Sequence, residues 1–204
     1  MISAIMPLGQ RHRHWTFWTA RGILYIAATT GSGAVTGALA GLAGAGLQRV
    51  FPFTLLAAVA ILLGGAYGLH ELGVWRLPQP QRAWQVPNRW IAQRPLLGAV
   101  AFGLVIGTGV LTFIPFTSFY LLLAWEVLTA SPAAGALLGG LYGLARALPV
   151  LLGGLSMRRG TSVATLHLNI LGATPQIHRV SSGVLLLGAA ILIIPLLLAT
   201  PLFR

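Results

Sequence analysis

The sequence has no cysteine, no lysine and no aspartate, and its only acidic residues are Glu71 and Glu126. Without cysteine the chain forms no disulfide, no thiolate metal site and no thiol nucleophile. Hydrolytic and metal-dependent catalysis need grouped His, Asp or Glu side chains, and two distant glutamates do not supply such a group. We therefore expect no enzyme activity, no metal site and no cofactor.

Charged residues are also scarce. They make up 7% of the 204 residues, whereas 56% are hydrophobic, and a soluble domain has about a quarter charged residues. A bilayer suits such a chain, provided that every backbone polar group is paired within the chain. Few stretches alternate apolar and polar residues as barrel strands do. The composition predicts an all-α integral membrane protein, which we place as a multi-pass protein in the bacterial cytoplasmic (inner) membrane.

Long apolar runs predict the membrane-spanning helices. A helix needs about 20 residues to cross the hydrocarbon core, and five runs reach that length: 22–48, 53–74, 95–130, 132–155 and 183–202. Residues 1–21 are expected to form a cytoplasmic N-terminal segment, and 22–204 a single polytopic membrane domain. The segment 161–179 mixes leucines with His167, Asn169 and Pro175, and we expect it to lie at the membrane interface.

The arginines predict the orientation. With five spans, ten of the thirteen arginines fall on one side of the membrane: Arg11, Arg13, Arg21, Arg76, Arg82, Arg89, Arg94, Arg158, Arg159 and Arg179. Arg49 and Arg204 fall on the other side. Positive loops stay in the cytoplasm, so the N-terminus is predicted to be cytoplasmic. The net charge of +11 is spread over loops near anionic lipids. The expected partners are the lipid bilayer and other membrane protein subunits, not nucleic acid.

Three residues charged at neutral pH fall inside the predicted spans, where unpaired charge is expensive. Glu71 and Arg146 lie in spans that run in the same direction, at similar depths, and we expect them to form an intramembrane ion pair. The pair either fixes helix register or acts as a gate. Glu126 lies near the outer end of the third span, where it could bind a proton or a cation.

Small residues recur at the spacing that lets membrane helices approach closely. The stripes are Gly33, Gly37 and Gly41; Gly103 and Gly107; and Gly135, Gly139 and Gly143. We expect these stripes to pack helices together inside the protein, although a dimer could use them too.

The third apolar run contains helix-breaking residues near its middle. Pro115 removes a backbone donor, and Gly107 and Gly109 precede it. The run is therefore predicted to be a long helix broken near Pro115. Transporters place binding sites at such breaks, and the expected substrate or ion path consists of Thr108, Thr112, Pro115, Thr117, Ser118 and Glu126. The alternative is a proline kink that only shapes packing.

Several of these segments resemble the membrane domain of the cytochrome c biogenesis (CcdA) and DsbD families. The residues are Ile114-Pro115-Phe116-Thr117 within 107–120, Tyr142-Gly143-Leu144 and Leu148-Pro149 within 135–149, and Ser182-Gly183-Val184-Leu185-Leu186. Phe116 stands where those families have a cysteine, and the first Pro-Cys helix is missing. The resemblance implies a cysteine-less, shortened scaffold without the thiol relay of those families.

Two functions from different classes fit these observations. The first is a non-catalytic membrane protein that moves a small solute or ion through a site at the broken helix. The second is a structural or accessory subunit of a larger respiratory, photosynthetic or maturation complex, which the missing reactive cysteines favour.

Overall fold

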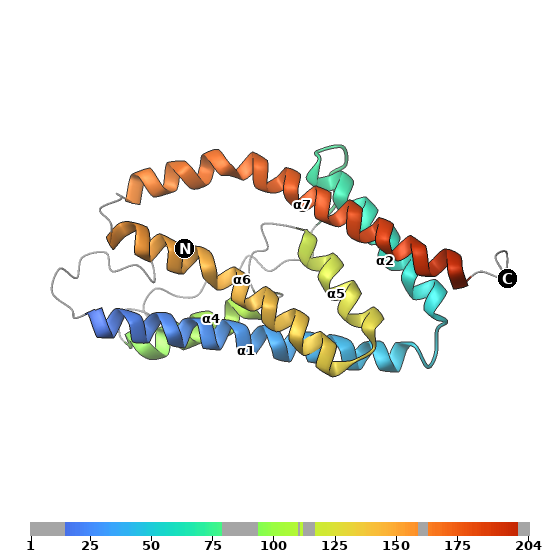
Figure 1. Ribbon diagram of the computed structural model, residues 1–204, viewed down its shortest axis with the longest axis horizontal. Helices are drawn as coiled ribbons and strands as arrows, with labels where there is room; N and C mark the ends of the chain where they lie inside the picture. The colour runs from blue at the N-terminus through green and yellow to red at the C-terminus, as the bar shows by residue number, and fades with distance from the viewer. Residues whose placement is uncertain (1–14, 79–93, 110, 112–116, 159–162, 200–204) are drawn as a thin grey trace. The chain divides into compact units, whose positions relative to one another are not determined.

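The computed structural model describes residues 15–78, 94–109, 111, 117–158 and 163–199 (Figure 1). These ranges contain six α-helices and no strand, so the all-α prediction is confirmed for the described residues. The helices are α1 (Trp15–Leu47), α2 (Phe53–Glu71), α4 (Pro95–Gly107), α5 (Ser118–Thr129), α6 (Pro132–Arg158) and α7 (Val163–Ala199).

Three helical stretches are long and apolar enough to cross a membrane: Phe17–Leu47, Phe53–Glu71 and Pro175–Ile193. Their outward faces expose large apolar side chains such as Ile23, Leu62 and Val180, as lipid-facing helices do. Helices α4 and α5 have 13 and 12 residues. At 1.5 Å per residue each is about 20 Å long, too short for a core of about 30 Å. The structure supports a membrane protein, and the count of five spans stays a prediction.

Helix α4 ends at Gly107 and α5 begins at Ser118, which agrees with the predicted break in 95–130, although Pro115 itself lies outside the described residues. The predicted boundaries differ from the observed ones in two other places. Helix α1 begins at Trp15, which places Arg21 inside a helix and buries it. Helix α7 is continuous from Val163, so the last helix begins well before Gly183; the interfacial position of 161–179 stays a prediction. Proline is tolerated inside membrane helices, and the presence of Pro175 was therefore a poor boundary signal.

The connection between α5 and α6 follows from local sequence. Ala130 closes α5 in the left-handed region, with φ 48°. The side-chain oxygen of Ser131 accepts a hydrogen bond from the backbone N–H of Ala134 at 3.3 Å, and Pro132 occupies the first helical position. Serine before proline is a strong helix start, because the hydroxyl caps a free donor and proline needs none.

Contacts divide the chain into two compact units, each built from segments far apart in sequence. Unit 1 contains α1 up to Thr36, α4, and the chain from Gly139 to Gly172. Unit 2 contains α1 from Gly37, α2, α5, α6 up to Leu138, and α7 from Ala173. Helices α1, α6 and α7 therefore contribute to both units. The predicted single membrane domain over 22–204 stays a prediction.

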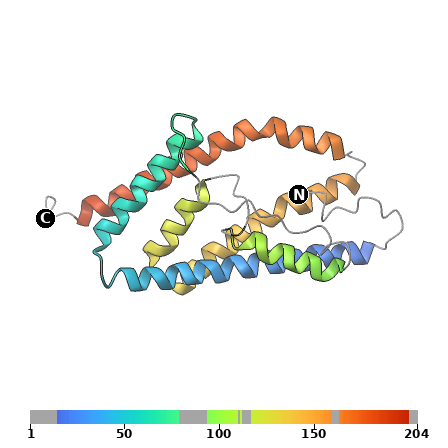
Figure 2. The ribbon, with the colours of Figure 1, turned by 180° about the vertical axis from the view of Figure 1, so that it is seen from behind.

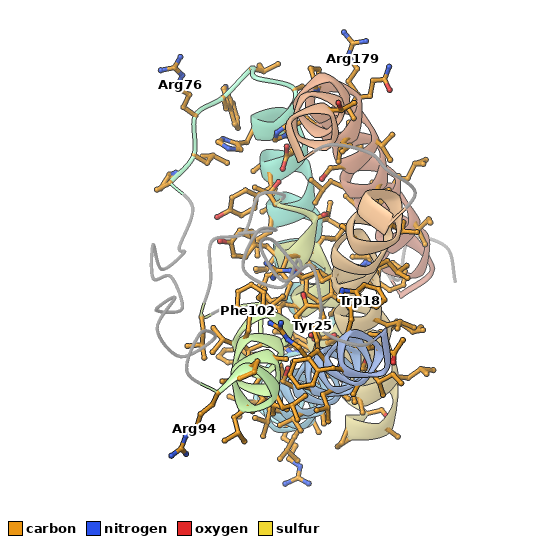
Figure 3. The ribbon with its side chains drawn as sticks, turned by 90° about the vertical axis from the view of Figure 1, so that its left-hand side faces the viewer. Trp18, Tyr25, Arg76, Arg94, Phe102 and Arg179 are labelled. Carbon is orange, nitrogen blue, oxygen red and sulfur yellow. The ribbon has the colours of Figure 1, made fainter. Side chains whose placement is uncertain are left out.

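The core of unit 1 joins α1 and α4, which lie side by side in Figures 1 and 2. Its buried apolar residues are Tyr25, Ala99, Phe102, Ile106 and Ala147. The rings of Tyr25 and Phe102 face each other (Figure 3) with centroids 5.8 Å apart. The hydroxyl of Ser32 donates to the carbonyl of Gly103 at 3.4 Å. A side chain at Gly103 would lie 2.8 Å from Ala28, so the small residues of α4 allow close approach.

Glycines also bring α1 and α6 together. In unit 1, an ideal Cβ at Gly33 would lie 3.1 Å from the carbonyl carbon of Gly139. In unit 2, a Cβ at Gly37 would lie 2.8 Å from the carbonyl carbon of Gly135, and one at Gly41 would lie 2.8 Å from that of Ser131. The helices meet backbone to backbone, which confirms that these stripes serve internal packing.

The rest of unit 2 packs α2 against α5 and α7. Figure 2 shows α2 beside the C-terminal part of α7, where a Cβ at Gly64 would lie 3.1 Å from the side chains of Ala189 and Leu121. The buried hydroxyl of Ser182 donates to the carbonyl of Gly68 at 3.1 Å. Between α2 and α5 the rings of Tyr67 and Tyr120 stack with centroids 4.9 Å apart.

Candidate functional site

A polar cluster lies at the C-terminal end of α2 in unit 2. Oε1 of Glu71 accepts hydrogen bonds from the backbone N–H of Thr117 at 2.7 Å and from its hydroxyl at 2.8 Å. Oε2 of Glu71 pairs with Nδ1 of His178. The Glu71 side chain is 2% exposed and that of His178 is 39% exposed. The carboxylate is therefore buried where α2, α5 and α7 meet, while the imidazole reaches the surface.

The end of α2 places Glu71 in this position. The N–H groups of Gly73 and Val74 donate to the carbonyls of His70 at 2.9 Å and Leu69 at 3.0 Å. Gly73 has φ +78°, the left-handed conformation that glycine adopts without a steric penalty. These two bonds form a Schellman motif, which satisfies carbonyls at the helix end. The chain thereby reverses directly after Glu71, and Glu71 becomes the last helical residue.

Thr117 supplies the other side of the cluster. It is the N-cap residue of α5 and is fully buried. A helix N-terminus carries partial positive charge and unsatisfied N–H groups, so a carboxylate is favourable there. Glu71, from α2, places its carboxylate at the N-terminus of α5. This interaction explains how an acidic side chain is tolerated beneath an apolar surface.

A cavity of about 450 Å³ opens beside the cluster, lined by His70, Glu71, Leu72, Gly73, Pro175, His178 and Arg179. Nδ1 of His70 accepts a hydrogen bond from the backbone N–H of Leu77 at 3.0 Å, which leaves its proton on Nε2. Arg179 and Arg76 both point away from the helices (Figure 3). The imidazole and carboxylate groups can share a proton, and the guanidinium adds a fixed positive charge. Within the described ranges, no three His, Cys, Asp or Glu side chains are grouped to bind a metal ion.

The predicted Glu71–Arg146 ion pair joins residues that belong to different units. Glu71 has the partners just described, and Nη1 of Arg146 donates to the hydroxyl of Tyr142 at 3.1 Å in unit 1. The pair itself stays a prediction. The role of His178 was missed, because 107 positions separate it from Glu71. One signal could have found it: the arginine pattern assigns both residues to the cytoplasmic side.

The predicted substrate or ion path is only partly within the described residues, and Thr112 and Pro115 lie outside them. Thr108 ends α4 in unit 1, where its hydroxyl donates to the carbonyl of Val105 at 2.8 Å. In unit 2, Thr117 bonds Glu71 and Ser118 begins α5. Glu126 lies further along α5 and is also buried. The path therefore stays a prediction.

A second cavity in unit 2 is an apolar groove of about 420 Å³. It is lined by the residues Leu47, Leu56, Val59, Ala60, Leu63, Tyr67, Tyr120, Leu123, Ala124, Val127 and Leu128. None of these side chains is charged at neutral pH. The groove therefore offers nothing to an ionic substrate, and its chemistry is that of lipid or of apolar side chains.

Comparison with known proteins finds similarity to proteins named "Methylamine utilization protein MauF". The one from Paracoccus versutus is 33% identical over 156 residues, 73% of this chain and 55% of that protein. Those of Methylorubrum extorquens and Paracoccus denitrificans are 34% and 32% identical, over 63% and 73% of this chain and 44% and 54% of their own lengths. The chain thus spans about half the length of the curated relatives it matches. No family model and no solved structure matches it.

These relatives overturn the resemblance to the CcdA and DsbD families, which was wrong. Its motifs were glycine-rich helices with nearby prolines, which bilayer packing favours in many polytopic proteins. Its distinguishing cysteines were absent. What the chain is similar to, over about three quarters of its length, is methylamine utilization protein MauF.

Proposed function

We propose that this chain is a non-catalytic accessory membrane protein of methylamine utilization. The observation that carries the proposal is the similarity to MauF proteins over 73% of the chain. The composition adds support, because two glutamates and no cysteine or aspartate leave little material for a catalytic site. Among the two functions considered above, the similarity favours the accessory subunit, and nothing in it supports solute transport.

The proposed setting is a multi-pass arrangement in the bacterial cytoplasmic membrane, with the arginine-rich end of unit 2 on the cytoplasmic side. Arg76 and Arg179 extend from this end (Figure 3), and positive segments stay in the cytoplasm. Because the chain has no cysteine, a single introduced cysteine is the only thiol in the protein that a maleimide can label. Its labelling therefore reports the side of the membrane on which that residue lies. A cysteine at Arg76 should resist a membrane-impermeant maleimide in whole cells, while one at the exposed Val50 should react. The opposite pattern would reverse the orientation.

An accessory role requires a protein partner. We expect that purification from the native membrane in mild detergent recovers a stoichiometric partner needed for methylamine oxidation. The many exposed apolar side chains of α1, α2 and α7 are suited to contacts with other membrane helices or with lipid. A protein recovered alone, at every detergent concentration, would count against a stable complex.

Deletion of the gene in its native host tests the function itself. The deletion strain should fail to grow on methylamine but grow normally on ammonium and a non-methylated carbon source, and the intact gene should restore growth. Two readouts separate accessory from transport roles. Loss of methylamine oxidation in broken-cell extracts supports the accessory role, whereas normal oxidation in extracts with lost uptake by intact cells supports transport. Normal growth on methylamine refutes both.

A further inference from the structure

Glu126 is a buried carboxyl that, unlike Glu71, has an oxygen atom without a hydrogen-bond partner among the described residues. Its residue is 1% exposed, and Oε1 has no hydrogen-bond partner among the described residues. Glu71, the only other side-chain carboxyl, accepts two hydrogen bonds from Thr117 and pairs with His178. Burying a carboxylate without compensating partners is very costly, and such a group normally becomes neutral instead.

The absence of a side chain at Gly37 makes room for Glu126. An ideal Cβ at Gly37 would lie 2.9 Å from Oε1 of Glu126 and 2.8 Å from the carbonyl carbon of Gly135. The carboxyl therefore reaches into the crossing of α1 and α6 within unit 2. The small-residue stripe and the buried carboxyl are separate observations that mark the same place.

No facing group can neutralise a charge on Glu126 within the described part of unit 2. The stretches 37–47 of α1 and 132–138 of α6 contain no ionisable residue. Arg49 lies beyond the end of α1 and is exposed. On α7, Gly188 packs near Leu121 and Trp125, and Arg179 is nine positions earlier, about 14 Å along a helix. Glu71 on α2 pairs with His178 on α7, and Tyr67 on α2 stacks against Tyr120 on α5.

We propose that Glu126 is a proton-binding site, whose carboxyl carries a proton in the folded protein and donates it toward the backbone oxygens of the α1–α6 crossing. The crossing is too tight for a hydrated cation, because it does not admit even a methyl group at Gly37 without a clash. A proton adds no heavy atom. The carbonyl of Gly135 lies against the same side of Gly37 as Oε1 and is an acceptor within this crossing.

Proton release then depends on helix packing. A glutamate in water has a pKa of about 4.3 and is protonated in only about one molecule in 500 at pH 7. If α5 separates from α1, water reaches Glu126 and the proton leaves. Contact between these helices is thereby coupled to binding of one proton. This inference does not depend on the proposed role in methylamine utilization.

Infrared spectroscopy of the full-length protein in mild detergent at pH 7 tests the site. Because the chain has only two side-chain carboxyls, the carbonyl stretch of a protonated acid can be assigned directly. Incorporation of ¹³C-labelled glutamate shifts any glutamic acid band and leaves the band of the C-terminal carboxyl unshifted. The matched variants are Glu126→Gln and Glu71→Gln.

The expected result is a shifted acid band in the wild type that is lost in Glu126→Gln and retained in Glu71→Gln. Its intensity should approach one acid group per chain, about 500-fold above that of a glutamate in water at this pH. If Glu126→Gln does not fold, a band retained in Glu71→Gln still assigns it to Glu126. No acid band in the wild type, or a band lost only in Glu71→Gln, would overturn the proposal.

Discussion

Replacing Gly37 by alanine tests the central packing contact of unit 2. The added methyl group would lie 2.8 Å from the carbonyl carbon of Gly135 and 2.9 Å from Oε1 of Glu126. Neither obstacle is the end of a flexible surface side chain: one is helix backbone and the other is a buried carboxyl. The variant therefore has to move α1 away from α6, or displace Glu126 from its position.

The magnitude follows from two opposing effects. Overpacking a tight contact costs about 1–3 kcal/mol, while alanine in a helix is favoured over glycine by about 0.5–1 kcal/mol. The clash is larger, so Gly37→Ala should lower the free energy of unfolding by about 1–2 kcal/mol. For a chain of this length each kcal/mol corresponds to about 2–4 °C in Tm, which predicts a fall of about 2–8 °C.

Gly46→Ala is the matched control, because Gly46 lies in the same helix and nothing lies within 4 Å of an added Cβ there. It should leave Tm unchanged or raise it slightly. The assay is thermal unfolding in one detergent, followed by far-UV circular dichroism and tryptophan fluorescence. If Gly37→Ala is as stable as Gly46→Ala, α1 and α6 do not meet at this glycine and the packing argument is refuted.

Other substitutions probe the polar cluster by the same assay. Glu71→Ala leaves the buried N–H of Thr117 without its acceptor, and its hydroxyl with only the longer bond to the carbonyl of Tyr67. The variant should cost about 1–3 kcal/mol, whereas Glu71→Gln keeps an acceptor oxygen and should cost less; equal losses would contradict the hydrogen bonds. His178→Ala should cost under about 1 kcal/mol, because a partner that is 39% exposed is screened by solvent; a larger loss than that of Glu71→Ala would be inconsistent with this reasoning. Gly73→Ala should cost about 1–2 kcal/mol, because φ is +78°, and Gly73→Asn should recover part of it. Ser182→Ala removes a buried hydroxyl donor and should cost about 1 kcal/mol, and no loss would show that this bond is not maintained.

The helical membrane class could be predicted from composition, because it depends only on the balance of apolar and charged residues. The close helix contacts could also be predicted, since Gly33, Gly37, Gly135 and Gly139 repeat at helical spacing and lie at the α1–α6 crossings. The helix boundaries were harder to predict from the sequence. Pro175 was one of the residues that set 161–179 apart from the last predicted span, but α7 continues through it, because membrane helices tolerate proline when neighbouring groups satisfy the freed carbonyl.

The tertiary structure decides which groups the side chains of Glu71 and Glu126 contact. The sequence showed that Glu71 and Glu126 were isolated carboxyls in apolar surroundings, and depth alone suggested Arg146 for Glu71. The described partners of Glu71 are Thr117 and His178, at separations of 46 and 107 residues, and its pairing with Arg146 stays a prediction. Residue spacing constrains contacts only within one helix turn or strand. Which distant groups meet depends on how α2, α5 and α7 pack, and that packing is also what leaves Glu126 buried without a partner for Oε1.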